Sequence, residues 1–249
     1  MVGVLTQEPK PAPVSRPATT ALAGSTWPEV RADALLVIPV GAVEQHGPHL
    51  PLDTDTRVAC AVAQQIPAAV VGPALCYGAS GEHEGFPGTV SLGAEALHAV
   101  LVELGRSACR WAARLAFVNG HGGNAPTLAR AVQLLRSEGR DVAWWPCAVP
   151  GTSTHPPDAH AGRTETSLLL HLDPAAVRWE LAVAGEIRPV AELMPELRAH
   201  GVRAVSPNGV LGDPMESTAA EGERLMTELV ARAAGAVAAW RPSSTGMLA

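Results

Sequence analysis

Charged and aromatic side chains are scarce in this chain of 249 residues. Charged residues make up 17%, aromatic residues 4%, and the formal net charge at pH 7 is −6. A slightly acidic chain without a basic cluster offers no surface for nucleic acid or for an anionic membrane, so neither is expected as a partner. The 47% hydrophobic content still suffices for a large core, and this length fits a single domain.

Paired cysteines, long apolar runs and familiar nucleotide motifs are also missing. Cys60, Cys76, Cys109 and Cys147 show no CxxC spacing, which argues against a thiolate zinc site or a disulfide framework. No apolar run reaches the roughly 18 residues that span a bilayer, and no signal-peptide pattern opens the chain, so we expect a cytoplasmic protein. No P-loop, GxSxG elbow or complete GxGxxG fingerprint occurs, which disfavours nucleotide-binding and serine hydrolase classes.

Apolar runs alternate with helical patterns along the chain. Residues 1–24 are rich in proline and alanine, so we expect a mobile N-terminal arm there. Continuous apolar runs fit strands of a sheet that is covered on both faces. Such strands are predicted over 34–40, 114–120 and 141–149, with another within 68–78.

Helices are predicted where apolar residues recur three and four positions apart. These segments are 56–66, 95–113, 124–139, 189–200 and 216–240. The alternation indicates a layered α/β fold with a largely parallel sheet flanked by helices, in which ligands bind beyond the carboxyl ends of the strands. We expect one domain over 25–241 and a C-terminal tail over 242–249.

The stretch VEQHGPHLPLDTD, residues 43–55, concentrates charge directly after a predicted strand. Residues two apart in an extended segment project to the same side, so Glu44 and His46 can face one point. Asp55 stands just before a predicted helix, where a loop could return its carboxylate towards them. Asp53 fits equally well as a helix cap or as a residue that supports a ligand.

Two further motifs supply candidate ligands. His121 follows the strand-like run LAFVNG in VNGHGGN, whose glycines allow the backbone to approach a ligand closely. His160 and Glu165 lie in DAHAGRTETSLLLHL, at the start of a predicted helix. A single histidine after a strand is more often structural than a ligand, but the clustering with acids at strand ends favours a metal site.

Nitrogen and oxygen ligands without thiolate are typical of catalytic zinc, manganese or iron. The set is too large for one tetrahedral ion that keeps open positions, so we expect two divalent ions with Asp55 as the candidate bridge. Two such ions can activate a water molecule and polarise an amide carbonyl. The leaving nitrogen also needs a proton, which His160 could supply if it is not a ligand.

Other polar residues near these motifs have open roles. GASGEHEGFPGTVSLG, residues 78–93, fits neither a strand nor a helix interior and is either a loop over the site or a long turn. His49, His83, Glu82 and Glu84 are less secure candidates. A metal-containing protein that binds a peptide without cutting it is the alternative from another functional class.

IPVGAVEQHGPHLPLDTDT, VNGHGGN and HAGRTETS, in this order, resemble the creatininase family of metal-dependent amidohydrolases, over roughly residues 30–240. The resemblance implies a layered creatininase-like fold, a closed homo-oligomer, and two divalent metal ions (Zn, Fe or Mn) in each subunit. It places the metal ligands on Glu44, His46, Asp55 and His121, with Asp55 bridging, and the catalytic role on His160.

One position departs from creatininase itself. Creatininase proper has a glutamate two residues after the histidine of its NGH motif, where this chain has Gly123. The missing ligand must come from elsewhere, and the resemblance to other branches of the family points to Glu165 as its replacement. Strict creatinine hydrolysis is therefore less expected.

Four stretches, YGASGEHEGFPGTVSLG, DAHAGRTETSLLLHLDP, SPNGVLGDPMESTAAEGERL and the terminal GML, resemble a peptidase branch of this family. That resemblance implies hydrolysis of one peptide bond near the C-terminus of a radical-modified precursor peptide, with release of a cyclised moiety derived from its terminal Val-Tyr pair. Hydrolysis of creatinine, a lactam or a formamide is the alternative with the same chemistry.

Overall fold

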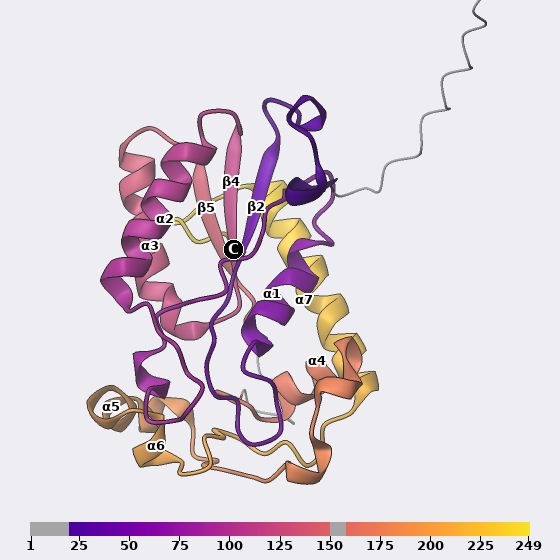
Figure 1. The fold of residues 1–249 in the computed structure, drawn as a ribbon, viewed down its shortest axis with the longest axis vertical. Helices are drawn as coiled ribbons and strands as arrows, with labels where there is room; N and C mark the ends of the chain where they lie inside the picture. Colours follow the sequence, from indigo (N-terminus) through magenta and orange to yellow (C-terminus); the bar gives the residue numbers. More distant parts are fainter. Residues whose placement is uncertain (1–19, 150–157) are drawn as a thin grey trace, which may run out of the picture.

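A parallel five-stranded sheet forms the middle layer of the molecule (Figure 1). The computed structural model describes residues 20–149 and 158–249. The strands follow the order β1-β3-β2-β4-β5 and are β1 (Thr20–Ala21), β2 (Leu35–Val40), β3 (Val70–Val71), β4 (Arg114–Asn119) and β5 (Val142–Pro146). The sheet and the helices around it confirm the predicted single-domain α/β fold.

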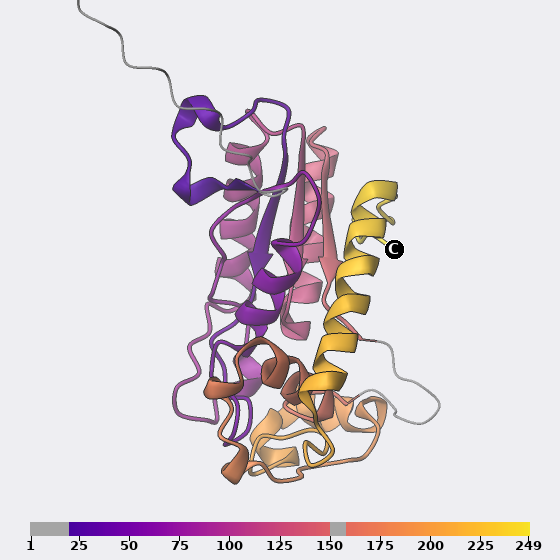
Figure 2. The same ribbon diagram turned by 90° about the vertical axis from the view of Figure 1, so that its right-hand side faces the viewer.

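Helices cover both faces of this sheet. They are α1 (Thr54–Ala63), α2 (Ala94–Ala108), α3 (Ala125–Ser137), α4 (Arg163–Leu172), α5 (Val190–His200), α6 (Val202–Val205) and α7 (Ala219–Ala239). Figures 1 and 2 place α2 and α3 on one face and α1 and α7 on the other. Within the described ranges, none of the helices combines the length and the apolar character needed to cross a bilayer.

Alternation along the strands builds two separate cores. Leu36 and Ile38 of β2 pack with the residues of α2 and α3, whereas Val37 between them packs with α1, α4 and α7. Trp144 and Trp145 of β5 divide in the same way, and both are buried. Because successive side chains of a strand point to opposite faces, the continuous apolar runs of the sequence fill both layers.

The pairing of β2 with β4 brings the candidate ligands together. Val40 and Asn119, the last residues of these strands, are register partners. The loop with Glu44 leaves the sheet after Val40, and His121 follows Asn119. Two adjacent parallel strands therefore deliver both segments to the same edge of the sheet, where sites of open α/β folds form.

Both ends of the described chain lie along the sheet. Of the expected arm 1–24, residues 1–19 fall outside the described residues, while Thr20 pairs with Val70 of β3. Near the C-terminus, Leu248 N–H donates to the Trp144 carbonyl, and the Gly246 carbonyl accepts from Trp144 N–H. The final segment thus runs beside β5 and extends the sheet by one short parallel contact.

Candidate metal centre

Asp55 stands between two histidines from different strand-end loops. Its Oδ1 lies 3.2 Å from His46 Nε2, and its Oδ2 lies 3.4 Å from His121 Nδ1. Asp55 is in the first turn of α1, His46 in the loop after β2, and His121 directly after β4. The two carboxylate oxygens therefore face two different imidazoles, which is the geometry that a bridging carboxylate requires.

Glu44 completes the His121 side of this cluster. Its side chain is fully buried, and Oε1 lies 3.2 Å from His121 Nδ1. Glu44, Asp55 and His121 form a group whose ligand atoms all lie within 4.8 Å of one another. One imidazole and two carboxylates in this arrangement could hold a divalent cation.

The start of α4 supplies the other side. Glu165 Oε2 lies 3.9 Å from His46 Nε2 and accepts a hydrogen bond of 2.6 Å from Ala161 N–H. The His160 ring lies tilted against that of His46 with centroids 4.3 Å apart, and His46, His160 and Glu165 form a second group of possible ligands. Ala161, between the histidine and the helix, is fully buried with φ of +52°. This left-handed residue makes the sharp turn that aims both side chains inward.

The six residues predicted as metal ligands or as the catalytic group thus meet in one place. Which of them bind metal and which does the catalysis stay predictions. Asp53 is not part of the cluster, because its carboxylate pairs with Arg57 at 2.7 Å on the surface of α1. His49 is buried nearby and pairs with Thr166 Oγ1 at 2.9 Å, so it supports the start of α4.

The loop 78–93 lies against the cluster and adds two residues that were only less secure candidates in the sequence. His83 Nε2 lies 3.3 Å from Glu44 Oε1, and the His83 ring lies tilted against that of His160 with centroids 4.4 Å apart. Glu82 Oε1 lies 3.4 Å from His121 Nε2. Their only signal in the sequence was the density of polar residues in GEHEG, which has no strand or helix period.

Three buried carboxylate oxygens in this cluster have no hydrogen-bond partner. They are both oxygens of Glu44 and Oδ2 of Asp55. The imidazole nitrogens near these oxygens do not reach hydrogen-bond geometry. A buried carboxylate in this state is costly unless a cation compensates it. The donor set therefore fits divalent cations, which accept carboxylate and imidazole ligands together.

The outer ring nitrogens of both histidines lie at backbone carbonyls. His46 Nδ1 lies 3.1 Å from the Glu44 carbonyl, and His121 Nε2 lies 3.2 Å from the Ala79 carbonyl. A carbonyl accepts only, so these nitrogens carry the hydrogens and donate. The opposite nitrogens can then offer lone pairs to a cation, which is the usual arrangement of histidine ligands.

The pKa values show which side chains of the cluster are charged when no cation is bound. Burial lowers the pKa of His46, but the carboxylates of Asp55, Glu165 and Glu44 together outweigh this effect and raise it to about 10. Burial raises the pKa of Glu44, yet His121, His83 and His46 together outweigh this effect, so the pKa falls to about 2. Burial raises the pKa of Glu165 to about 7. Without cations, protonated His46 therefore compensates the ionised carboxylates.

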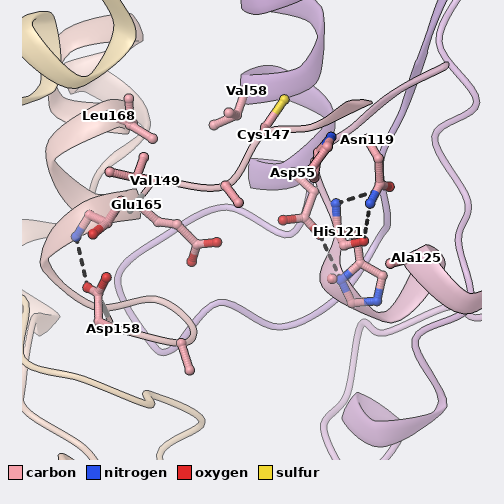
Figure 3. Close-up of a pocket in the computed structure, with 16 residues that line it drawn as sticks. Asp55, Val58, Asn119, His121, Ala125, Cys147, Val149, Asp158, Glu165 and Leu168 are labelled. Atoms are coloured by element: carbon pink, nitrogen blue, oxygen red, sulfur yellow. Dashed lines mark hydrogen bonds and ion pairs between the residues drawn. The ribbon is translucent and has the colours of Figure 1, made fainter. Parts of the chain in front are cut away.

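A cavity of about 310 Å³ opens beside these residues. Asp55, His121 and Glu165 form its polar wall, whereas Val58, Val149 and Leu168 contribute apolar surface. Figure 3 shows Glu165 reaching from α4 towards Asp55, with His121 on the opposite side. The volume lies within the range of small-ligand pockets, so a substrate group bound here would contact the cluster directly.

Fold and site together define a layered α/β protein with a candidate divalent-metal centre of carboxylates and imidazoles. The family model for creatininase, described as creatinine amidohydrolase, matches residues 23–237. The chain therefore belongs to the creatininase family, whose members hydrolyse amide bonds.

Two relatives carry a narrower description. The chain is 56% identical to "Mycofactocin precursor peptide peptidase" of Mycolicibacterium smegmatis over 223 residues, which cover 86% of this chain and 88% of that protein. It is 52% identical to the protein of the same description from Mycobacterium tuberculosis over 244 residues, covering 93% of both chains.

Solved structures of similar fold include metal forms of creatininase. A structure described as "Creatininase Mn" superimposes with a TM-score of 0.74 at 27% identity, covering 90% of this chain and all of that one. A creatininase mutant described as "Zn-Zn type" gives a TM-score of 0.72 at 28% identity, covering 90% of this chain and 98% of that one.

Proposed function

We propose that this protein is a dinuclear metal-dependent peptidase that cleaves the radical-modified mycofactocin precursor peptide near its C-terminus and releases the cyclised moiety derived from Val-Tyr. The identity to the mycobacterial peptidases over most of both chains supports the substrate. The placement of the Asp55 carboxylate between His46 and His121 is the observation that carries the chemistry.

Glu44, Asp55 and His121 would hold one cation, and His46 and Glu165, with Asp55 as the bridge, would hold the other. Divalent cations at these positions would polarise the scissile carbonyl and lower the pKa of the attacking water. The orphaned oxygens of Glu44 and Asp55 support this assignment. Zinc, iron and manganese all suit the donor set.

His160 would move the proton. Burial, together with the charge on His46, keeps the pKa of this ring well below 6.5, so the ring is neutral. Its Nε2–H donates to the Gln45 carbonyl at 2.7 Å, which leaves Nδ1 on the side of Glu44 with a free lone pair. Nδ1 can accept the proton of the attacking water and pass it to the leaving amine as the carbon–nitrogen bond breaks and the carbon–oxygen bond forms.

The apolar wall of the cavity supports a hydrophobic substrate end. Val58, Val149 and Leu168 line the same cavity as the carboxylates. A valine- or tyrosine-derived group held against them would bring the adjoining peptide bond to the cluster. We place this reaction in the cytoplasm and expect the working form to be a homo-oligomer, as the family resemblance implies.

The test is a mass spectrum of the radical-modified precursor peptide after incubation with the metal-loaded protein, beside a chelator-treated control. Loss of the Val-Tyr-derived fragment only with metal present is the expected result. Cleavage of creatinine, a lactam or a formamide instead of the peptide would replace the substrate and keep the chemistry. Metal-loaded protein that binds the peptide and leaves every such substrate intact would show a binding protein.

A further inference from the structure

The side-chain amide of Gln45 is buried at the junction of three segments. Its Oε1 accepts a hydrogen bond of 2.9 Å from Gly47 N–H. Its Nε2 lies 2.9 Å from His83 Nδ1, 3.1 Å from the Gly209 carbonyl and 3.1 Å from His160 Nε2. The amide thus joins the loop after β2 to loop 78–93 and to the SPNGV turn, neither of which the proposed reaction uses.

The number of hydrogens on each nitrogen determines which atom donates and which accepts in each contact of the Gln45 amide. The bond from Gly47 N–H fixes which end of the amide is oxygen, so Nε2 has two hydrogens to donate. His160 Nε2 cannot accept one, because it already donates to the Gln45 backbone carbonyl. The two hydrogens therefore go to the Gly209 carbonyl and to His83 Nδ1. His83 is then a neutral ring with its hydrogen on Nε2.

The backbone around the amide is shaped to hold it. Gly209 has φ of +82°, and a Cβ at this position would collide with Gln45 Oε1. Only glycine can adopt this positive φ without strain and also leave room for the Gln45 amide. Gln45 itself is 5% exposed, so its amide has no alternative partner in bulk water.

We propose that Gln45 is a positioning residue of the metal centre: its amide keeps the hydrogen of His83 on Nε2, 3.3 Å from Glu44 Oε1. His83 then turns an N–H group, and not a lone pair, towards the Glu44 carboxylate, and it does not bind a cation. The inference rests on the proposed role of Glu44 as a ligand. It also determines whether the third group of possible ligands, Glu44, His83 and His160, can bind a cation. With a hydrogen on His83 Nε2, this group holds no cation.

Histidine labelled with ¹⁵N reads this arrangement directly, because long-range ¹H–¹⁵N spectra distinguish the two neutral tautomers. In the full-length, metal-free protein we expect His83 to be the Nε2–H tautomer. In the Gln45→Glu variant the donor beside Nδ1 is gone, so the ring hydrogen is expected to move to Nδ1. Gln133→Glu, on α3, is the matched control, since that amide donates to the Ser244 carbonyl away from the cluster.

Zinc affinity, measured by competition with a chelating dye, provides the second readout. Gln45→Glu and His83→Leu should each weaken zinc binding by about 10–100-fold, as expected for residues that support ligands. His83→Gln should remain close to the unmodified protein, because its amide can place a donor near the former Nε2. Gln133→Glu should change neither the tautomer nor the affinity.

An Nδ1–H tautomer in the unmodified protein would overturn the proposal. So would a Gln45→Glu variant that keeps both the His83 signals and the zinc affinity of the Gln133→Glu control, or a His83→Gln variant as weak as His83→Leu. Failure of the unmodified protein to bind zinc, iron or manganese would contradict the metal centre itself. The tautomer, which is read without metal, would still decide the link between Gln45 and His83.

Discussion

Gly123 and Glu82 share one space: a Cβ built at position 123 would lie 2.5 Å from Glu82 Oε1. The same Cβ would also collide with the ring of His121, and Glu82 Oε1 lies 3.4 Å from Nε2 of that ring. Creatininase proper resembles this chain but carries a glutamate at this position. Here the space belongs to a carboxylate from loop 78–93, while the acid on the cavity side is Glu165 from α4.

Gly123→Glu should therefore weaken the centre although it restores the residue of creatininase. The new side chain must displace Glu82 and tilt His121, and we expect a loss of zinc affinity of about 10–100-fold. Competition with a chelating dye measures this zinc affinity. Gly122→Ala is the control, because a Cβ at that neighbouring position meets nothing within 4 Å. Equal affinity in the two variants would contradict the packing argument.

Removal of a predicted ligand should remove metal and turnover together. Glu44→Ala, His46→Ala and His121→Ala each delete a buried group of the cluster. We expect less than two equivalents of metal by elemental analysis after gel filtration and no detectable peptide cleavage. His98→Ala, on α2, should keep both. A ligand variant with full metal content and activity would exclude that residue from the centre.

His160→Ala should separate metal binding from catalysis. The variant should retain its metal and lose about 10²–10⁴-fold in kcat, the usual contribution of a positioned acid–base group. Elemental analysis and single-turnover mass spectrometry give the two readouts. Because His160 also lies within ligand distance of His46 and Glu165, loss of metal in this variant would make it a ligand.

The metal-free protein should become less stable as the pH rises from 6.5 to 10. The pKa of His46 is about 10 in the folded chain against 6.5 ordinarily. The stabilisation by its protonated form is therefore complete below pH 6.5 and is lost as the pH approaches 10. Thermal melts of chelator-treated protein over this range should show a falling Tm.

His46→Ala provides the control for this pH effect. Its Tm should be lower at pH 6.5 and should change less towards pH 10, since the raised pKa has been removed. Metal binding should show the opposite trend, because a cation must replace the proton of His46 and binds better as the pH rises. A parallel decline in the two proteins would assign the pH dependence to other groups.

Local periodicity predicts the long elements of this fold well. The run 114–120 contains β4 (Arg114–Asn119), and 124–139 contains α3 (Ala125–Ser137). The run 95–113 overshoots α2, which ends at Ala108, because the apolar residues that follow pack as the connection into β4. Apolar spacing therefore locates these elements without fixing where each one ends.

Some residues of the candidate site can be predicted from local sequence, and others depend on contacts between distant segments. Glu44 and His46 could be found because a strand end places them on one side within three residues. The role of His83 could not, since its contact with Gln45 spans 38 positions and depends on a loop without any period. Polar contacts between irregular segments leave no repeating trace in a sequence.

The segment beside β5 determines where the sheet stops. β5 is an outer strand, and Gly246 and Leu248 exchange main-chain hydrogen bonds with Trp144 along its outer side, with Leu248 buried. An uncovered outer strand is a template on which another chain can add and aggregate. Here Gly246 and Leu248 occupy the main-chain groups of Trp144 to which another strand would otherwise pair. Another chain could therefore pair with β5 at Trp144 only after displacing this segment.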